Sequence, residues 1–188
     1  MSTLFLRSEV KSFEKRTALS PENAKELLRL GHRVIVEKSE NRIFSDYEYQ
    51  QVGCEIAEPG VWKSASKDSY VLGLKELSCD SQQSIEHKHI YFAHAYKSQS
   101  HSKELLSKFS KGGGVLYDLE YLLDCKGQRV AAFGLYAGIA GAALGITAWY
   151  SKSSQPRSSF EDKIYFHQEE MLNELNSIIK KYNVLPKV

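Results

Sequence analysis

Short apolar runs alternate with amphipathic stretches along most of the chain. Runs rich in β-branched and aromatic residues predict buried strands. They are LFLR (4–7), RVIVE (33–37), CEIA (54–57), YVLGL (70–74), HIYFA (89–93), VLYD (115–118) and RVAAF (129–133). Strands that alternate with helices are typical of a parallel sheet. The pattern therefore predicts an α/β fold, with a Rossmann-like, mostly parallel sheet flanked by helices.

Two helix starts stand out in the first half of the chain. Residues 20–22 offer a serine cap, a proline for the first turn and an acid at the positive end of the helix dipole, and Gly31 is the natural stop. Residues 45–46 cap a second helix, which Gly53 closes. Each predicted helix is followed by a predicted strand, which supports the alternating pattern.

Residues 130–150 allow two interpretations. They carry no charge over about the length that spans a bilayer, and Gly134/Gly138 and Gly141/Gly145 have the spacing of packed membrane helices. The alternative is a short strand followed by a small-residue helix that packs tightly on a sheet. The glycines, threonine and tyrosines weaken the membrane signal and favour the second interpretation.

The character of the chain changes after Tyr150. A polar, serine-rich linker comes first, and residues 161–182 then show apolar positions at three- and four-residue spacing, which predicts one long helix. The last residues, 185–188, resemble the beginning of a strand. We therefore expect a domain over 1–150 and a linker with a long helix over 151–188.

Composition narrows the classes of protein. With 188 residues, 42% of them hydrophobic, the chain can form a domain with a core. A net charge of +2 without a basic field argues against a nucleic-acid partner. The histidines form no HExxH and the cysteines no paired CxxC, so we expect no metal. Three widely spaced cysteines and a short N-terminal apolar run predict a cytoplasmic protein with reduced thiols and no membrane association.

Acid–base side chains follow several of the predicted strands. In open parallel sheets, ligands bind beyond the carboxyl ends of the strands. Taken singly, each side chain could be a solvated lysine, a hydrogen-bonded loop histidine or one half of a surface ion pair. Their common placement instead favours one shared site. The residues are Lys11, Glu14, Arg16, Lys75, Glu76, His94, Tyr96, Lys97, Gln99, Asp118 and Glu120.

Longer strings carry a family resemblance. RTALSPEN around Arg16 resembles the R-x-A-L-[ST]-P opening shared by alanine dehydrogenases, transhydrogenases and saccharopine dehydrogenases. GLKEL, HIYFAHAYK, GGGVLYDLEYL and RVAAFGLYAGIAGAALG are more specific, and over residues 4–150 the chain is similar to the NAD-dependent, lysine-forming saccharopine dehydrogenases of fungi. One departure is Ala95, where this family commonly has cysteine.

The resemblance implies the substrate-side half of such an enzyme, without the half that binds NAD. A G-x-G-x-x-G-type loop after a strand is missing, and Gly138, Gly141 and Gly145 lie inside a helix signal. We interpret these glycines as close-packing positions, so no residue of this chain is predicted to bind the cofactor.

The implied reaction converts saccharopine, NAD and water to L-lysine, 2-oxoglutarate and NADH. By resemblance, Lys75 takes the proton from the secondary amine and His94 activates the water that hydrolyses the imine. Lysine suits this role if its surroundings lower its pKa toward neutrality. Glu76 and Glu120 would tune the basicity of the pair.

The resemblance also assigns partners for the substrate's carboxylates. Arg16 and Lys97 are the first candidates, and Lys11 and Gln99 are weaker ones. The expected ligands are saccharopine, lysine and 2-oxoglutarate.

Three hypotheses remain open. The first is a family enzyme represented by a partial chain, which needs a separate NAD-binding half. The second is a truncated, non-catalytic relative that binds a ligand or a protein and self-associates through the exposed face of helix 161–182. The third, a small membrane protein that uses residues 130–150, ranks last.

Overall fold

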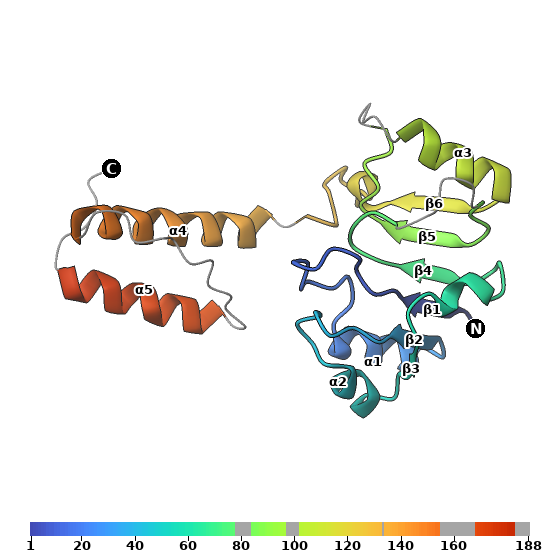
Figure 1. Cartoon of the computed structure of the whole chain (residues 1–188), viewed down its shortest axis with the longest axis horizontal. Helices are drawn as coiled ribbons and strands as arrows, with labels where there is room; N and C mark the ends of the chain where they lie inside the picture. The colour runs from blue at the N-terminus through green and yellow to red at the C-terminus, as the bar shows by residue number, and fades with distance from the viewer. Residues whose placement is uncertain (78–83, 97–101, 133, 155–167, 183–188) are drawn as a thin grey trace. The chain divides into compact units, whose positions relative to one another are not determined.

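The computed structural model describes residues 1–77, 84–96, 102–132, 134–154 and 168–182. The chain forms two compact units, Met1–Ala131 and Ala132–Val188 (Figure 1). This division falls earlier than residue 150, where the sequence pattern placed the domain boundary. The assignment of 1–150 as one domain remains a prediction.

A six-stranded sheet forms the centre of the first unit. Its strand order is β3-β2-β1-β4-β5-β6, and every neighbouring pair is parallel. The predicted α/β fold with a Rossmann-like parallel sheet is confirmed. The strands are β1 (Thr3–Leu6), β2 (Arg33–Glu37), β3 (Glu55–Ala57), β4 (Tyr70–Leu72), β5 (Lys88–Tyr91) and β6 (Val115–Asp118).

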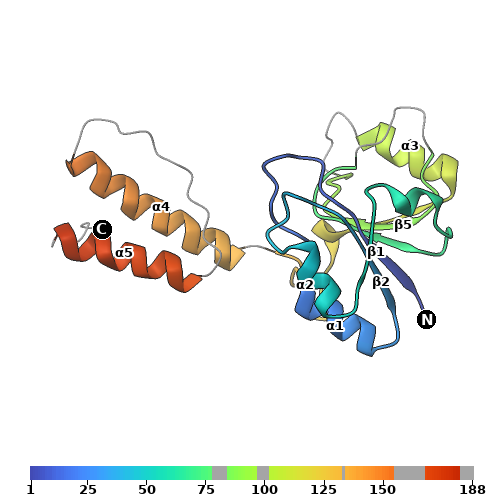
Figure 2. The ribbon, with the colours of Figure 1, turned by 60° about the horizontal axis from the view of Figure 1, so that its bottom comes forward.

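Helices cover both faces of this sheet. Leu6, Val34 and Val36 face α1 (Pro21–Arg29) and α2 (Asp46–Gln51), which lie together on one side (Figure 2). Phe5 and Val71 point to the other side, where the short helix η1 (Val61–Ser64) packs. The central strands are therefore buried on both faces, as their uninterrupted apolar runs predict.

The predicted helix caps are present. The Ser20 side chain accepts a hydrogen bond from the backbone of Asn23 at 3.2 Å, and Gly31 follows the helix with a φ of +83°. Ser45 and Glu48 form a reciprocal capping box at the start of α2. Each cap satisfies backbone donors that a helix start leaves unpaired, and so fixes where the chain enters the helix.

The sequence pattern did not single out α3 (Ser102–Gly112). Its Phe109 packs with Ile85 and Tyr91 on the same side of the sheet as η1. At the end of α3 the backbone runs against Ile85, and a Cβ on Gly112 or Gly114 would overlap the Ile85 carbonyl. Gly112 and Gly114 are therefore needed for close backbone approach before β6 begins, and Gly113 between them has a φ of +72°.

The predicted strand RVAAF is wrong in its described part. Arg129 forms an isolated antiparallel bridge with Leu123, and the residues that follow it are not in a strand. The Asp124 side chain accepts hydrogen bonds from the backbone of Lys126 and Gln128, each at 2.8 Å. These bonds form a tight turn around Gly127, which has a φ of +75°. Local turn chemistry therefore outcompetes the apolar strand signal.

The second unit consists of α4 (Gly134–Ser154) and α5 (Gln168–Tyr182). Ala143 on α4 packs with Met171 and Leu175 on α5. Part of the predicted helix 161–182 is thus present, and residues 161–167 lie outside the described residues. Among the described residues of this unit, nothing lies within 4 Å of a Cβ placed on the glycines of α4, so the expected close packing at these positions is not seen within the unit. Among the described residues, no helix is long and apolar enough to cross a membrane.

Candidate functional site

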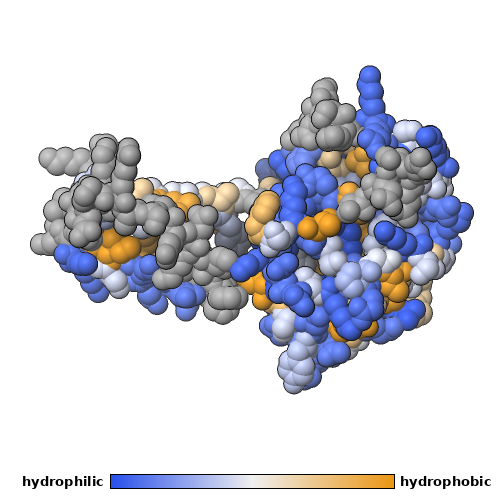
Figure 3. All heavy atoms as spheres, in the orientation of Figure 1, coloured by the Kyte–Doolittle hydropathy of each residue, from blue (hydrophilic) through white to orange (hydrophobic). Residues whose placement is uncertain are grey.

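Four segments with acid–base side chains meet at one edge of the sheet. Strands β1, β4, β5 and β6 are consecutive neighbours and run parallel, so their carboxyl ends lie side by side (Figure 1). The segments that leave these ends carry the predicted site residues that the structure describes. On the face drawn in Figure 3 the first unit is mostly hydrophilic, with hydrophobic residues scattered among polar ones. Because the acid–base side chains gather at these strand ends, the edge is the best candidate for chemistry.

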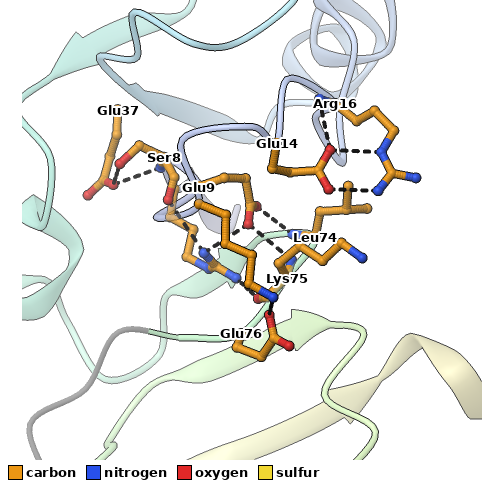
Figure 4. A network of polar contacts seen from close by, with 10 residues as sticks. Ser8, Glu9, Glu14, Arg16, Glu37, Leu74, Lys75 and Glu76 are labelled. Carbon is orange, nitrogen blue, oxygen red and sulfur yellow. Dashed lines mark hydrogen bonds and ion pairs between the residues drawn. The ribbon is translucent and has the colours of Figure 1, made fainter. Parts of the chain in front are cut away.

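Lys75 follows β4 on a segment held by buried charges. The Glu9 carboxylate accepts hydrogen bonds from the backbone of Leu74 at 2.7 Å and of Lys75 at 3.0 Å (Figure 4). Arg7 pairs with Glu9 at 3.4 Å and donates a hydrogen bond to the Lys75 carbonyl. Gly73 is needed here because a Cβ would overlap the Arg7 guanidinium. The backbone of Lys75 is thus fixed, while its side chain is half-buried.

Arg16 is held by Glu14 in the segment after β1. The Nε and Nη2 atoms of Arg16 lie 2.7 and 2.6 Å from the two carboxylate oxygens of Glu14, which is buried. The hydrogen bond from Arg16 lowers the pKa of Glu14 and outweighs the opposing effect of burial, and the positive charge of Lys75 adds to the lowering. Glu14 therefore stays ionised and orients an arginine whose side chain is 53% exposed.

Lys11 and Glu76 pair across the same edge. The Lys11 ammonium lies 2.9 Å from the Glu76 carboxylate, and both side chains are exposed. The hydrogen bond from Lys11 is the largest cause that lowers the pKa of Glu76, and the charge of Lys75 contributes. An exposed pair of this kind stabilises a protein by only about 0–1 kcal/mol, so another carboxylate can compete for Lys11.

His94 follows β5 in an unusual backbone conformation. Its φ of +50° makes it the one non-glycine residue with a positive φ in the described part of the chain. The imidazole stacks on the Phe92 ring at 6.4 Å between centroids. Its Nδ1 lies 3.7 Å from Glu120, too far for a hydrogen bond, and makes none with the described residues. Glu120 also pairs with Arg129 at 3.0 Å, so this carboxylate faces both groups.

Asp118 fixes the turn that carries His94. Its two carboxylate oxygens accept hydrogen bonds from the backbone of Ala93 and Ala95, each at 3.2 Å, on either side of the histidine. The same side chain accepts a hydrogen bond from the Glu120 backbone at 3.1 Å. One residue at the end of β6 thus orients both the histidine turn and the glutamate beside it.

The structure brings together most, not all, of the predicted site residues. Lys75 and His94 occupy neighbouring strand ends, with Glu76, Lys11, Arg16 and Glu120 on the same edge. Lys97 and Gln99 lie outside the described residues. Sequence reasoning missed Arg7 and Glu9, although two opposite charges directly after an apolar strand are a signal that could have found them. It grouped Asp118 with the acid–base side chains, whereas its carboxylate binds backbone amides.

The described residues do not fit a dinucleotide. Gly138, Gly141 and Gly145 lie within α4, and none of them forms a turn between a strand and a helix. A pyrophosphate site of the dinucleotide-binding kind needs such a turn, with backbone N–H groups at the start of a helix. The glycines of α4 therefore offer NAD no pyrophosphate site.

The fold and the edge define a class, a parallel α/β domain that gathers acid–base and carboxylate-binding groups at its strand ends. A family model described as the N-terminal domain of alanine dehydrogenase/PNT matches residues 5–140. The chain belongs to this family.

Named relatives narrow the comparison. Saccharopine dehydrogenase [NAD(+), L-lysine-forming] of Yarrowia lipolytica is 44% identical over 191 residues, which cover 98% of this chain and 52% of that protein. The Schizosaccharomyces pombe protein of the same name is 44% identical over 157 residues, which cover 84% of this chain and 43% of that protein. The chain thus spans about half the length of the curated relatives it matches.

Solved structures agree on the fold. A transhydrogenase from Sinorhizobium meliloti superposes with a TM-score of 0.62 at 22% identity, over 79% of this chain and 44% of that one. An L-alanine dehydrogenase superposes with a TM-score of 0.58 at 20% identity, over 81% of this chain and 42% of that one. At these identities the likeness shows the fold alone.

Proposed function

We propose that this chain is the substrate-side part of an NAD-dependent saccharopine dehydrogenase of lysine biosynthesis. The observation that carries the proposal is the placement of Lys75 and His94 on neighbouring strand ends, each on a segment held by a carboxylate. The names of its fungal relatives supply the substrate class.

The chemistry asked of this chain is proton transfer. When the C–N bond of saccharopine is oxidised, its secondary amine must lose a proton, and the resulting imine must take up water. Lys75 accepts the amine proton. His94 takes a proton from the attacking water and later returns one to the departing lysine amine. Positioned general acids and bases of this kind contribute about 10²–10⁴-fold to a rate.

Two acidic residues lie beside these bases. Glu120 lies 3.7 Å from the imidazole of His94 and 3.0 Å from Arg129, so its carboxylate is shared between the two. Glu76 is ionised and shared between Lys11 and the field of Lys75. A substrate carboxylate that binds Lys11 would compete with Glu76 for this ammonium.

The carboxylates of saccharopine need cationic partners at the same edge. Arg16 is oriented by Glu14 and its side chain is 53% exposed, and Lys11 is exposed. We assign these two residues to substrate carboxylates, together with Lys97 and Gln99 in the segment after His94. The hydride acceptor has to come from outside the residues described, and NAD is the expected acceptor from the names of the relatives.

The test compares turnover in a complete enzyme. The chain would be joined to, or mixed with, the NAD-binding half of a fungal relative, and saccharopine-dependent NADH formation would be measured. Lys75→Met and His94→Gln should each lower turnover by about 10²-fold or more. Lys67→Met, which removes an exposed lysine paired with Glu86, is the matched control and should retain full turnover. Unchanged rates in the first two variants would reject the assignment.

A non-catalytic binding module is the second candidate. Its support is the apolar surface of the helix pair in the second unit, where Leu135, Tyr136 and Leu144 are 72%, 66% and 53% exposed. Such a surface favours self-association, with α5 as part of the contact. Sedimentation equilibrium should then show a molecular mass that rises with concentration, and a stable monomer at all concentrations would count against this candidate.

A further inference from the structure

Both backbone polar groups of Lys75 are bound by buried side chains. Its N–H donates to Glu9 at 3.0 Å, and its carbonyl accepts from Arg7. The side chains of Arg7 and Glu9 are only 3% and 8% exposed. The peptide groups on both sides of the Lys75 Cα are therefore held, and neither can rotate without breaking a charge-assisted hydrogen bond.

The hydrogen bonds from Glu9 and Arg7 begin where the hydrogen bonds between β4 and β5 end. The Gly73 N–H still donates to Ile90 of β5 at 3.0 Å, and the Leu74 carbonyl accepts from Phe92 at 3.3 Å. By contrast, the N–H groups of Leu74 and Lys75 donate to Glu9, and the Lys75 carbonyl accepts from Arg7. Arg7 and Glu9 thus hold the backbone of Lys75, the residue that follows the last hydrogen bond of the sheet on this strand.

Stability alone does not account for such a pair. Removing two charges from water costs about as much as their attraction returns, and apolar residues of similar size often serve a core equally well. Apolar residues could not, however, form hydrogen bonds with the N–H and the carbonyl of Lys75, and these bonds fix the backbone from which the lysine side chain starts. The arrangement therefore points to a geometric role.

We propose that Glu9, held in place by Arg7, is the positioning residue for Lys75. It fixes the lysine backbone beyond the end of β4, so that the side chain leaves the strand at the edge that also carries Glu14 and Glu76 (Figure 4). This inference rests on the proposed function of Lys75 as the group that accepts the amine proton.

The first measurement uses the unaltered chain. Hydrogen exchange followed by NMR should show the Leu74 and Lys75 amides to be protected, at least about 100-fold slower than in a free peptide, like the amides of a closed structural unit. Exchange at the free-peptide rate would overturn the proposal, whatever any variant does.

The second measurement uses Glu9→Gln, which replaces one acceptor oxygen with a donor amide. Because glutamine keeps one acceptor oxygen and no negative charge, one of the bonds to Leu74 and Lys75 is lost and the other is weakened. The exchange of the more affected amide should therefore accelerate at least about tenfold relative to Val71 within β4. A short pulse of acetic anhydride, read by peptide mass spectrometry, should label Lys75 faster relative to Lys11 in the same molecule, by about threefold or more.

Controls separate positioning from general weakening. Glu26→Gln breaks an exposed pair with Arg29 on α1 and should leave both ratios unchanged. If Glu9→Gln does not fold, Arg7→Met/Glu9→Gln removes both charges together and avoids an unpaired buried ion. Unchanged ratios in a folded variant would overturn the proposal.

Failure of this inference is distinguishable from failure of the proposed function. The exchange and labelling ratios report how Lys75 is held, whatever reaction it serves. If the ratios change but Lys75→Met keeps its turnover, the positioning stands and the assigned chemistry fails. If the ratios do not change in Glu9→Gln but Lys75→Met loses turnover, the assigned chemistry of Lys75 stands and Glu9 has no positioning role.

Discussion

His94 combines backbone strain with candidate chemistry. A non-glycine residue with φ of +50° is held there by its surroundings, and strained positions of this kind cluster at functional sites. The surroundings are identifiable, because Asp118 binds the amides on both sides of the histidine. The strain is therefore maintained by the neighbouring strand and places the imidazole beside Glu120.

The strain predicts the relative stability of two variants. His94→Gly and His94→Ala both remove the imidazole, but glycine tolerates the positive φ, so the glycine variant should be more stable by about 1 kcal/mol. Urea denaturation gives the comparison. At His32, which does not have a positive φ, alanine should be the more stable of the two because glycine loses more backbone entropy on folding. Equal stabilities of the two variants at position 94 would mean that the turn relaxes when the histidine is lost.

Strand β5 carries a histidine whose role is different. His89 lies on the face shared by η1 and α3, with its ring 5.0 Å from that of Trp62 and 5.6 Å from that of Phe109. Neither ring nitrogen has a hydrogen bond among the described residues. Burial lowers the pKa of His89 to about 3, and the nearby His87 and Arg7 add to the lowering. The imidazole is therefore neutral in the fold and acts as a core residue.

This burial predicts a pH dependence of stability. The unfolded chain protonates His89 near pH 6.5 and the folded chain only near pH 3, so its contribution is complete above about pH 6.5 and is lost as the pH falls toward 3. The free energy of unfolding should fall by up to about 1.4 kcal/mol per pH unit in this window. His89→Leu should flatten this slope in denaturation measured between pH 4 and 7, whereas His32→Leu, which removes a half-exposed imidazole, should keep it. A slope identical in all three proteins would contradict the assignment.

Elements with local signals were predictable and those without were not. RVIVE and VLYD form β2 and β6 over the predicted residues, and the caps at Ser20 and Ser45 begin their helices as expected. The prediction of a strand at RVAAF was wrong because the turn around Gly127 brings the chain back on itself, and the Val130 N–H donates to the Leu122 carbonyl at 2.9 Å. Neither α3 nor the extent of α4 followed from apolar periodicity alone.

At the scale of the whole first unit, parallel topology gathers the site. Residues far apart in sequence, such as Arg16, Lys75 and Glu120, reach one edge because their strands are adjacent and run in the same direction. This collection could be predicted from where polar residues follow apolar runs. The buried contacts of Arg7 and Glu9 could not be predicted from the sequence, since they depend on which backbone groups the sheet leaves unpaired.

The most direct test of the central claim is an NMR titration of the isotopically labelled chain with saccharopine. If Lys75 and His94 share one substrate site, the signals of their side chains should shift together along a single binding curve. Arg33 and Glu55 pair at the amino ends of β2 and β3, away from the site, so their resonances should not shift. Shifts confined to one of the two residues, or absent from both while others move, would contradict the account.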